Sequence, residues 1–246
     1  MPLPVASPSF STQESRAAQS FPAALLLSFT GGFLDAFLYV AHGRVFAGAL
    51  TGNVILAGIA LLSHNTRDIT LHVLPILGFI AGICSAFFTG IRLRHHVVLV
   101  ALVAESVGLF VASFLPATFP DSLFILLLSG LAGYQVGSFR KVDNFLYNAT
   151  FITGSIVRAV EAFHAIQLGI DPDESRRALR DLGSIVVLFA VGVVAAVLLA
   201  GRMSNRALWV PTAAVLGVLA MAIFGDLRHP EPADSQPANG KAGESN

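Results

Sequence analysis

Charged residues are scarce in this sequence. Only 12% of its 246 residues are Asp, Glu, Lys or Arg, against about 25% in soluble domains, while 54% are hydrophobic and the mean hydropathy is +0.73. The apolar residues lie in long continuous blocks, without the alternation of apolar and polar residues that barrel strands show. The composition therefore predicts an all-α membrane protein.

Cysteine is almost absent, and neither sign of charge is in excess. The single Cys84 excludes an internal disulfide and any zinc site built from cysteines. Lys and Arg number 15, as do Asp and Glu, and no basic cluster is present, so we expect no nucleic-acid partner. The 7 histidines show no metal spacing, and there is no H-E-x-x-H, no glycine-rich phosphate loop and no Ser/His pattern of an intramembrane protease. We therefore expect no metal, no cofactor and no enzymatic activity.

The two ends of the sequence are polar. Residues 1–20 contain Arg16 as their only basic residue and fit a secretory signal poorly, so we expect a polar tail and a first apolar block that is kept as a span. Residues 226–246 are rich in Pro, Gly and charge and are expected to be a second disordered tail. Residues 21–225 are then a single transmembrane domain.

Eight apolar segments divide this domain, and a full span needs about 20 mainly apolar residues. They lie at residues 22–42, 45–63, 72–91, 97–115, 122–139, 145–168, 182–201 and 207–225. Segment 45–63 is short and interrupted by glycine, whereas 145–168 carries Arg158, Glu161 and His164 along one side, which also suits an amphipathic surface helix. The other six segments are expected to cross the membrane.

The distribution of Lys and Arg favours this topology, because these residues accumulate in cytoplasmic loops. If segments 45–63 and 145–168 do not cross, both tails lie inside with ten basic residues, against four outside; if they cross, the numbers are equal. The inside set is Arg16, Arg92, Arg94, Arg140, Lys141, Arg176, Arg177, Arg180, Arg228 and Lys241, and the outside set is Arg44, Arg67, Arg202 and Arg206. The prediction is six spans, two short or re-entrant helices and cytoplasmic termini.

The first four segments resemble the last four. Leu25-Leu26-Leu27-Ser28 recurs as Leu126-Leu127-Leu128-Ser129, and Gly32 recurs as Gly133 at the same offset. One residue of slippage later, Ala47 matches Ala149 and Thr51-Gly52 matches Thr153-Gly154. The alternative to a repeat is chance matching between apolar segments, but the order of the matches favours two repeats, 22–116 and 121–225. Three crossings in each half would make the second half inverted, a recurrent plan of transporters.

Polar residues in the first two segments are the main candidates for a site. Asp35 lies past the middle of the first segment and shares a helix face with Tyr39. It could bind a proton, a cation or a polar substrate, or it could pair with Arg44 or a helix end. Thr51, Gly52 and Asn53 in segment 45–63 could hydrogen-bond a substrate; close packing of small residues is the alternative, with Gly31 and Gly32 expected to be structural.

Further candidates lie in the later segments. Glu105, near the middle of segment 97–115, is expected to be protonated or paired, either as a proton relay or as a hydrogen bond between helices. Gln135 could hydrogen-bond across helices, and Thr153 and Gly154 repeat the earlier Thr-Gly pair. Three glycines are expected to permit close helix packing: Gly78, Gly82 and Gly133.

These motifs resemble those of the YoaK-like family of bacterial membrane proteins, a family of unknown function. The resemblance rests on residues 31–36 (GGFLDA), Val45-Phe46 and Thr51-Gly52-Asn53, with looser matches at Gly133-Tyr134-Gln135 and residues 150–154. The family pattern has a polar residue where this chain has Val136, and more often Asn where it has Ser155. The resemblance implies an inner-membrane protein of about six spans and brings no substrate.

Two functions remain open on the sequence. The first is a secondary transporter for a small polar solute, coupled to protons through Asp35 or Glu105. The second is a membrane scaffold or accessory subunit whose polar residues only join helices. Convergence of Asp35, Thr51, Asn53, Gln135 and Thr153 on one cavity would favour transport, and separate dry contacts would favour the scaffold. The lipid bilayer is the expected partner in both cases, and the oligomeric state stays open.

Overall fold

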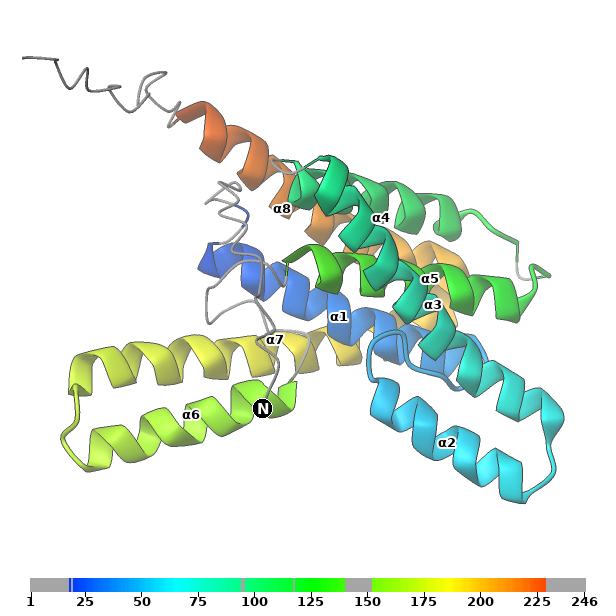
Figure 1. Cartoon of the computed structure of the whole chain (residues 1–246), viewed down its shortest axis with the longest axis horizontal. Helices are drawn as coiled ribbons and strands as arrows, with labels where there is room; N and C mark the ends of the chain where they lie inside the picture. The colour runs from blue at the N-terminus through cyan, green and yellow to red at the C-terminus, as the bar shows by residue number, and fades with distance from the viewer. Residues whose placement is uncertain (1–17, 19, 94–95, 117, 140–151, 229–246) are drawn as a thin grey trace, which may run out of the picture.

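The computed structural model describes residues 18, 20–93, 96–116, 118–139 and 152–228, and these residues form helices and short links between them (Figure 1). The elements are α1 (Phe21–Ala41), α2 (Leu50–Leu62), α3 (Thr66–Arg92), α4 (Val97–Ser113), α5 (Asp121–Phe139), α6 (Ile152–Gln167), α7 (Pro172–Met203), the 3-10 helix η1 (Ser204–Leu208) and α8 (Trp209–Arg228). The all-helical prediction is confirmed for this part of the chain.

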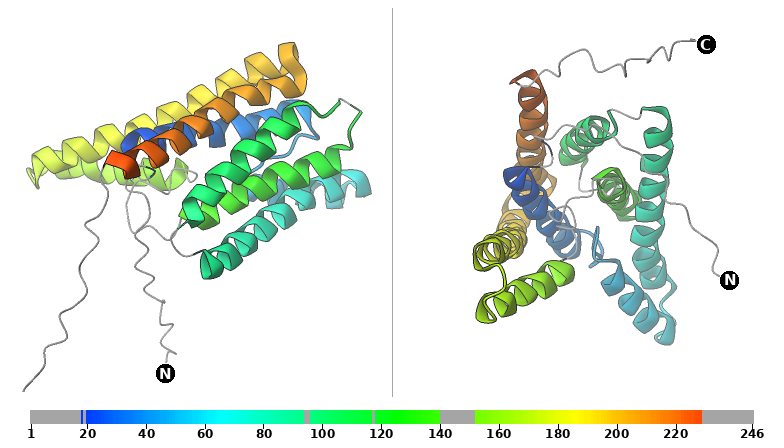
Figure 2. Two further views of the ribbon diagram at one scale, coloured as in Figure 1. Left: turned by 90° about the horizontal axis from the view of Figure 1, so that it is seen from above. Right: turned by 60° about the vertical axis from the view of Figure 1, so that its left-hand side comes forward.

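Among the described residues, four helical stretches are long and apolar enough to cross a membrane: α1, α3, α5 and the run Pro172–Phe224. The last run is not one straight helix, because Ser204 has a φ of 51° and η1 follows it. The chain turns there, and α8 runs back in the direction opposite to α7, with α1 in contact with both helices (Figure 2). The helices α2 and α4 are apolar but shorter, with 13 and 17 residues. The architecture is that of a multi-pass membrane protein.

Helix α7 begins ten residues before the apolar segment predicted at 182–201. Pro172 occupies its first turn, and Asp173 and Glu174 follow, where carboxylates interact favourably with the helix dipole. Hydropathy could not mark this start, because the first turns are charged. Helix α6 begins at Ile152, and residues 145–151 of the predicted segment 145–168 lie outside the described residues.

The most extensive helix contacts are those of α1 with α7 and of α3 with α5. Helix α4 packs between α5 and α8, and α1 also contacts α8. The short helices lie outside this bundle, with α2 against α3 and α6 against α7. Figure 1 shows the α2–α3 and α6–α7 hairpins at opposite ends of the picture. The α2–α3 and α6–α7 contacts join neighbouring helices within one half of the chain. The other extensive contacts each join one of the helices α1–α4 with one of the helices α5–α8.

Glycines bring the backbones of α1 and α7 together. A Cβ atom at Gly32 would collide with the carbonyl of Phe189, and one at Gly192 would collide with the carbonyl of Phe29. Such close approach of backbones is how membrane helices gain van der Waals contact without a hydrophobic driving force.

The contact between α3 and α5 is built in the same way. A Cβ atom at Gly82 would collide with the carbonyl of Gly130, and one at Gly133 would collide with the carbonyl of Phe79. Gly78 faces Leu126 and Ser129 of α5 one turn earlier. The two helix pairs, α1 with α7 and α3 with α5, are therefore both held by close contacts of glycine with the backbone of the other helix.

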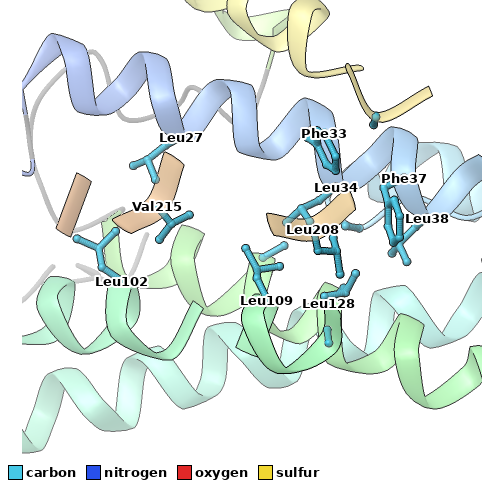
Figure 3. Packing of buried hydrophobic residues seen from close by; sticks show 14 of the residues in the cluster. Leu27, Phe33, Leu34, Phe37, Leu38, Leu102, Leu109, Leu128, Leu208 and Val215 are labelled. Atoms are coloured by element: carbon cyan, nitrogen blue, oxygen red, sulfur yellow. The ribbon is translucent and has the colours of Figure 1, made fainter. Parts of the chain in front are cut away.

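A buried apolar cluster fills the space between the helix pairs (Figure 3). It includes Leu34 of α1, Leu109 of α4, Leu128 of α5 and Leu208 of η1, each at most 2% exposed. Side chains from both halves of the sequence thus meet in an apolar centre.

Candidate functional site

The carboxylate of Asp35 binds backbone N–H groups just before α2. Its Oδ1 accepts a hydrogen bond of 2.6 Å from Gly48 N and one of 3.4 Å from Ala49 N. Asp35 is 9% exposed and lies in α1, two turns before the helix ends. An anion at this place satisfies N–H groups that precede a helix and complements the helix dipole. This geometry corresponds to the helix-end alternative for Asp35.

Asn53 holds the same connection from the other side. Its Oδ1 accepts a hydrogen bond of 2.9 Å from Phe46 N, and its Nδ2 donates one of 2.8 Å to Phe46 O. Asn53 is fully buried, so its carboxamide is engaged with backbone at both ends. The link between α1 and α2 therefore has its polar backbone groups satisfied by the side chains of Asp35 and Asn53.

The ring of Phe46 completes this unit. Tyr39 stacks on it with ring centroids 5.1 Å apart, and a Cβ atom at Gly52 would lie 2.8 Å from it. Tyr39 is 41% exposed, and Thr51 is exposed as well. We call this unit the α1–α2 cluster; its members are Asp35, Tyr39, Phe46, Gly52 and Asn53. Irregular backbone at membrane depth needs such partners, because lipid supplies none.

Glu105 and Gln135 form a second polar site, in the interior of the bundle. Gln135 Nε2 donates a hydrogen bond of 2.7 Å to Glu105 Oε2. Glu105 is 1% exposed and Gln135 is 7% exposed. The other carboxyl oxygen, Oε1, has no hydrogen-bond partner among the described residues, and neither do the buried hydroxyls of Ser106 and Ser138. A buried carboxyl with an unpartnered oxygen can hold a proton or accept a hydrogen bond from a ligand.

The structure divides the predicted site residues into separate places. Asp35, Tyr39, Gly52 and Asn53 share the α1–α2 cluster, whereas Glu105 and Gln135 share the α4–α5 contact. Thr153 is exposed on α6, and a Cβ atom at Gly154 would meet nothing within 4 Å. The residues Asn148 to Phe151, which would complete the second motif, lie outside the described residues.

Three residues absent from the predicted set join the helices at one end of the bundle: His42, Asp121 and Asn205. His42 follows α1, Asp121 opens α5, and Asn205 lies in η1. Both ring nitrogens of His42 are hydrogen-bonded, one to each of the other two side chains. These three residues are far apart in sequence, so no motif spacing could have grouped them. The one available signal is that each is a polar residue at or next to the end of an apolar segment.

Comparison with known proteins agrees with the resemblance noted in the sequence. The family described as protein of unknown function DUF1275 matches residues 23–221. The UPF0700 transmembrane protein YoaK of Bacillus subtilis (strain 168) is 26% identical over 207 residues, which cover 80% of this chain and 91% of the relative. No solved structure matches the chain.

Proposed function

The chain belongs to the DUF1275 family of proteins of unknown function, and we propose that it is a secondary transporter for a small polar solute, built from two inverted halves in the bacterial inner membrane. The observation that carries this proposal is the Glu105 carboxyl, which is buried inside the bundle and bonded through only one of its oxygens. An ionisable group at membrane depth is costly, and such groups mark ion, proton and substrate sites.

The pattern of helix contacts supports inverted halves. If α1–α4 correspond to α5–α8, the contact of α1 with α7 corresponds to that of α5 with α3. Likewise α2 with α3 corresponds to α6 with α7, and α1 with α8 to α5 with α4. A two-fold relation between the halves requires these three correspondences, and their presence supports the proposal.

The glycine contacts extend this correspondence to single residues. Gly32 against Phe189 corresponds to Gly133 against Phe79, and Gly192 against Phe29 corresponds to Gly82 against Gly130. The same offset relates α1 to α5 in both contacts, and a second constant offset relates α3 to α7. The offset from α1 to α5 is also the one that relates Leu25-Leu26-Leu27-Ser28 to Leu126-Leu127-Leu128-Ser129, so the contacts agree with the repeat in the sequence.

Six crossings follow if α7 and α8 count separately and α4 crosses. The 17 residues of α4 span about 26 Å, close to the hydrocarbon thickness of about 30 Å. Each half then supplies three crossings and one short helix, α2 or α6. With six crossings, both termini lie on the same side of the membrane, and the distribution of Lys and Arg favours the cytoplasmic side. Residues 42–49 turn back toward the level of Asp35 before α2 begins, as a re-entrant segment does.

In this scheme the two polar sites have different tasks. The α1–α2 cluster stabilises an irregular segment, which is tolerated at membrane depth only inside protein or beside a cavity. Glu105 and Gln135 supply the site for a proton or a polar group of the solute: Gln135 fixes one oxygen of the carboxyl and leaves Oε1 for the ligand. No enzymatic step is part of this proposal.

Uptake into proteoliposomes tests it. The purified protein, supplied with pools of labelled small polar solutes, should accumulate at least one of them, and a pH gradient should change the rate if protons are coupled. The Glu105→Gln variant keeps the size of the side chain and should lose this gradient dependence. The matched control is Glu161→Gln, an exposed position on α6, which should transport as the wild type does. Unchanged uptake by Glu105→Gln would remove Glu105 from the mechanism.

The second candidate is a membrane scaffold or accessory subunit. Two observations favour it. Asp35 and Asn53, Gln135, and Thr153 lie in three separate places and do not converge on one site, which is the arrangement expected of a scaffold. In addition, Asp35 and Asn53 hydrogen-bond to the backbone of the α1–α2 link. Under this function no solute is taken up, a partner protein co-purifies in fixed proportion, and Asp35→Asn lowers the stability in detergent without changing any flux. A reproducible Glu105-dependent uptake would exclude this candidate as the main function.

A further inference from the structure

His42 has both ring nitrogens bonded to side chains from distant parts of the sequence. Nδ1 lies 2.8 Å from Oδ1 of Asp121, and Nε2 lies 2.9 Å from Oδ1 of Asn205. The His42 side chain is 8% exposed, so these two side chains, and not water, are its main hydrogen-bond partners.

The two partners of the ring are both acceptors. An ionised Asp121 can only accept. The orientation of Asn205 is set by its Nδ2, which donates a hydrogen bond of 2.9 Å to Leu115 O; a flipped carboxamide would bring two oxygens together. The imidazole must therefore donate from Nδ1 and from Nε2, and a ring with a proton on each nitrogen is a cation.

The aromatic surroundings also suit a cation. The ring of Phe124 stacks on the imidazole with centroids 4.0 Å apart and planes 15° apart. The ring of Phe37 lies 5.4 Å away, tilted by 52°. The faces of aromatic rings attract a cation through their quadrupole, so Phe124 adds to the effect of Asp121.

Asp121 supplies the negative charge that faces His42. The cations nearest in sequence to the bonded residues, Arg44 and Arg206, are exposed. Helix α3 approaches this end through Leu71, beside Gly43, and carries Asp68, which is partly exposed, and His72, which is buried. In the link between α4 and α5, residues 114–120, no residue is charged, and the carbonyl of Leu115 accepts the hydrogen bond of Asn205.

We propose that His42 is a proton-binding residue whose imidazolium form holds this end of the bundle closed. Its bonds connect the end of α1, the start of α5, the turn between α7 and α8 and, through Asn205, the link between α4 and α5. A neutral ring has one N–H and must give up one of its two bonds. The closed form therefore holds one proton more than the released form, so it is favoured at low pH and lost as pH rises.

The proton site joins the two halves of the chain, so its release would loosen them at this end. A role of His42 in gating a transport cycle rests on the proposed function, whereas the binding of a proton by His42 does not. The two can fail separately, because a spectroscopic titration without any solute tests the proton site alone.

Trp209 is a built-in reporter of this end of the bundle. It is the only tryptophan in the chain and directly follows η1. Its Nε1 donates a hydrogen bond of 2.8 Å to Ser113 Oγ, at the end of α4 and close in sequence to Leu115. A change in the contact between α4 and η1 should alter the fluorescence of this indole.

The experiment is a titration of Trp209 fluorescence in the purified full-length protein in nanodiscs. The wild type should show one transition with the slope of a single proton as pH rises. His42→Gln, which cannot become a cation, should lose this transition. The control is His164→Gln: His164 is exposed on α6, where its Nδ1 lies 2.9 Å from Val160 O of the same helix, and this variant should keep the transition.

Asp121→Asn covers the case in which His42→Gln does not fold. It keeps an acceptor but removes the charge, so the transition should move to lower pH. A wild-type titration without a transition, a transition that persists in His42→Gln, or one that Asp121→Asn leaves in place would each overturn the proposal.

Discussion

Gln135 and Glu105 face each other across the contact of α5 with α4, and the amide of Gln135 lies 2.7 Å from one oxygen of the carboxyl. Both side chains are buried, and the second oxygen of Glu105 has no partner among the residues that the structure describes. Gln135 is thus the group that satisfies half of a carboxyl that would otherwise be alone in an apolar interior. This pairing makes the stability of the bundle and the chemistry of Glu105 dependent on each other.

Gln135→Leu should destabilise the protein by about 1–3 kcal/mol, because it leaves a buried carboxyl without its donor. The double variant Glu105→Leu with Gln135→Leu should recover most of this loss, since no buried polar group is then left unpaired. Unfolding in mixed detergent micelles, followed by circular dichroism, measures both. Equal losses from the two single variants that add up in the double variant would show that the side chains do not interact.

Gly192→Ala should destabilise the contact of α1 with α7 by about 1–3 kcal/mol, because its Cβ atom would collide with the backbone of Phe29. Gly201→Ala is the matched control on the same helix, where a Cβ atom would meet nothing within 4 Å, and it should be neutral or slightly stabilising.

Gly82→Ala, the corresponding change in the contact of α3 with α5, should cost as much as Gly192→Ala if the two halves are equivalent. Thermal unfolding of the three variants in one detergent gives the comparison. A loss confined to Gly192→Ala would argue against equivalent halves.

Asn53→Ala should destabilise the protein by about 1–3 kcal/mol or more, because the N–H and the carbonyl of Phe46 would lose their partners in a buried place. The exposed neighbour Thr51 serves as control, and Thr51→Ala should change stability by less than about 0.5 kcal/mol. Protease susceptibility of the α1–α2 link, together with thermal unfolding, measures the effect. An Asn53→Ala protein with wild-type stability would show that the α1–α2 link does not depend on this side chain.

The six-span topology predicts that Arg44 and Arg92 lie on opposite sides of the membrane. Both are exposed, so single cysteines at these positions, in a Cys84→Ser background, are suitable reporters. A membrane-impermeant maleimide added to whole cells should label the cysteine at 44 and not the one at 92, whereas both should react after lysis. Labelling of both positions in whole cells would contradict this topology.

The sequence predicted the helical class and the positions of most helices, because continuous apolar blocks can satisfy the backbone in lipid only as helices. It located the ends of α5 within one residue but began α7 ten residues late, since charged turns before an apolar segment carry no hydropathy signal. The close-packed faces of α1, α3, α5 and α7 could be suspected from their glycines, but which helices they join could not be read from the sequence.

The candidate site was predicted residue by residue but not as an arrangement. Asp35 and Asn53 stood out because polar side chains are rare in apolar segments, yet their backbone partners, Gly48 and Phe46, carry no chemical signal. The pairing of Glu105 with Gln135 depends on the rotation of two helices, which hydropathy does not determine. His42 was overlooked because its partners come from other parts of the chain.

The glycine contacts also determine which parts of the molecule can move as units. Each tight pair, α1 with α7 and α3 with α5, takes one helix from each half of the sequence. The halves therefore cannot separate as rigid bodies without breaking both pairs. An opening that keeps both pairs intact would separate α1 and α7 from α3 and α5, and the buried leucines of Figure 3 lie between the two pairs.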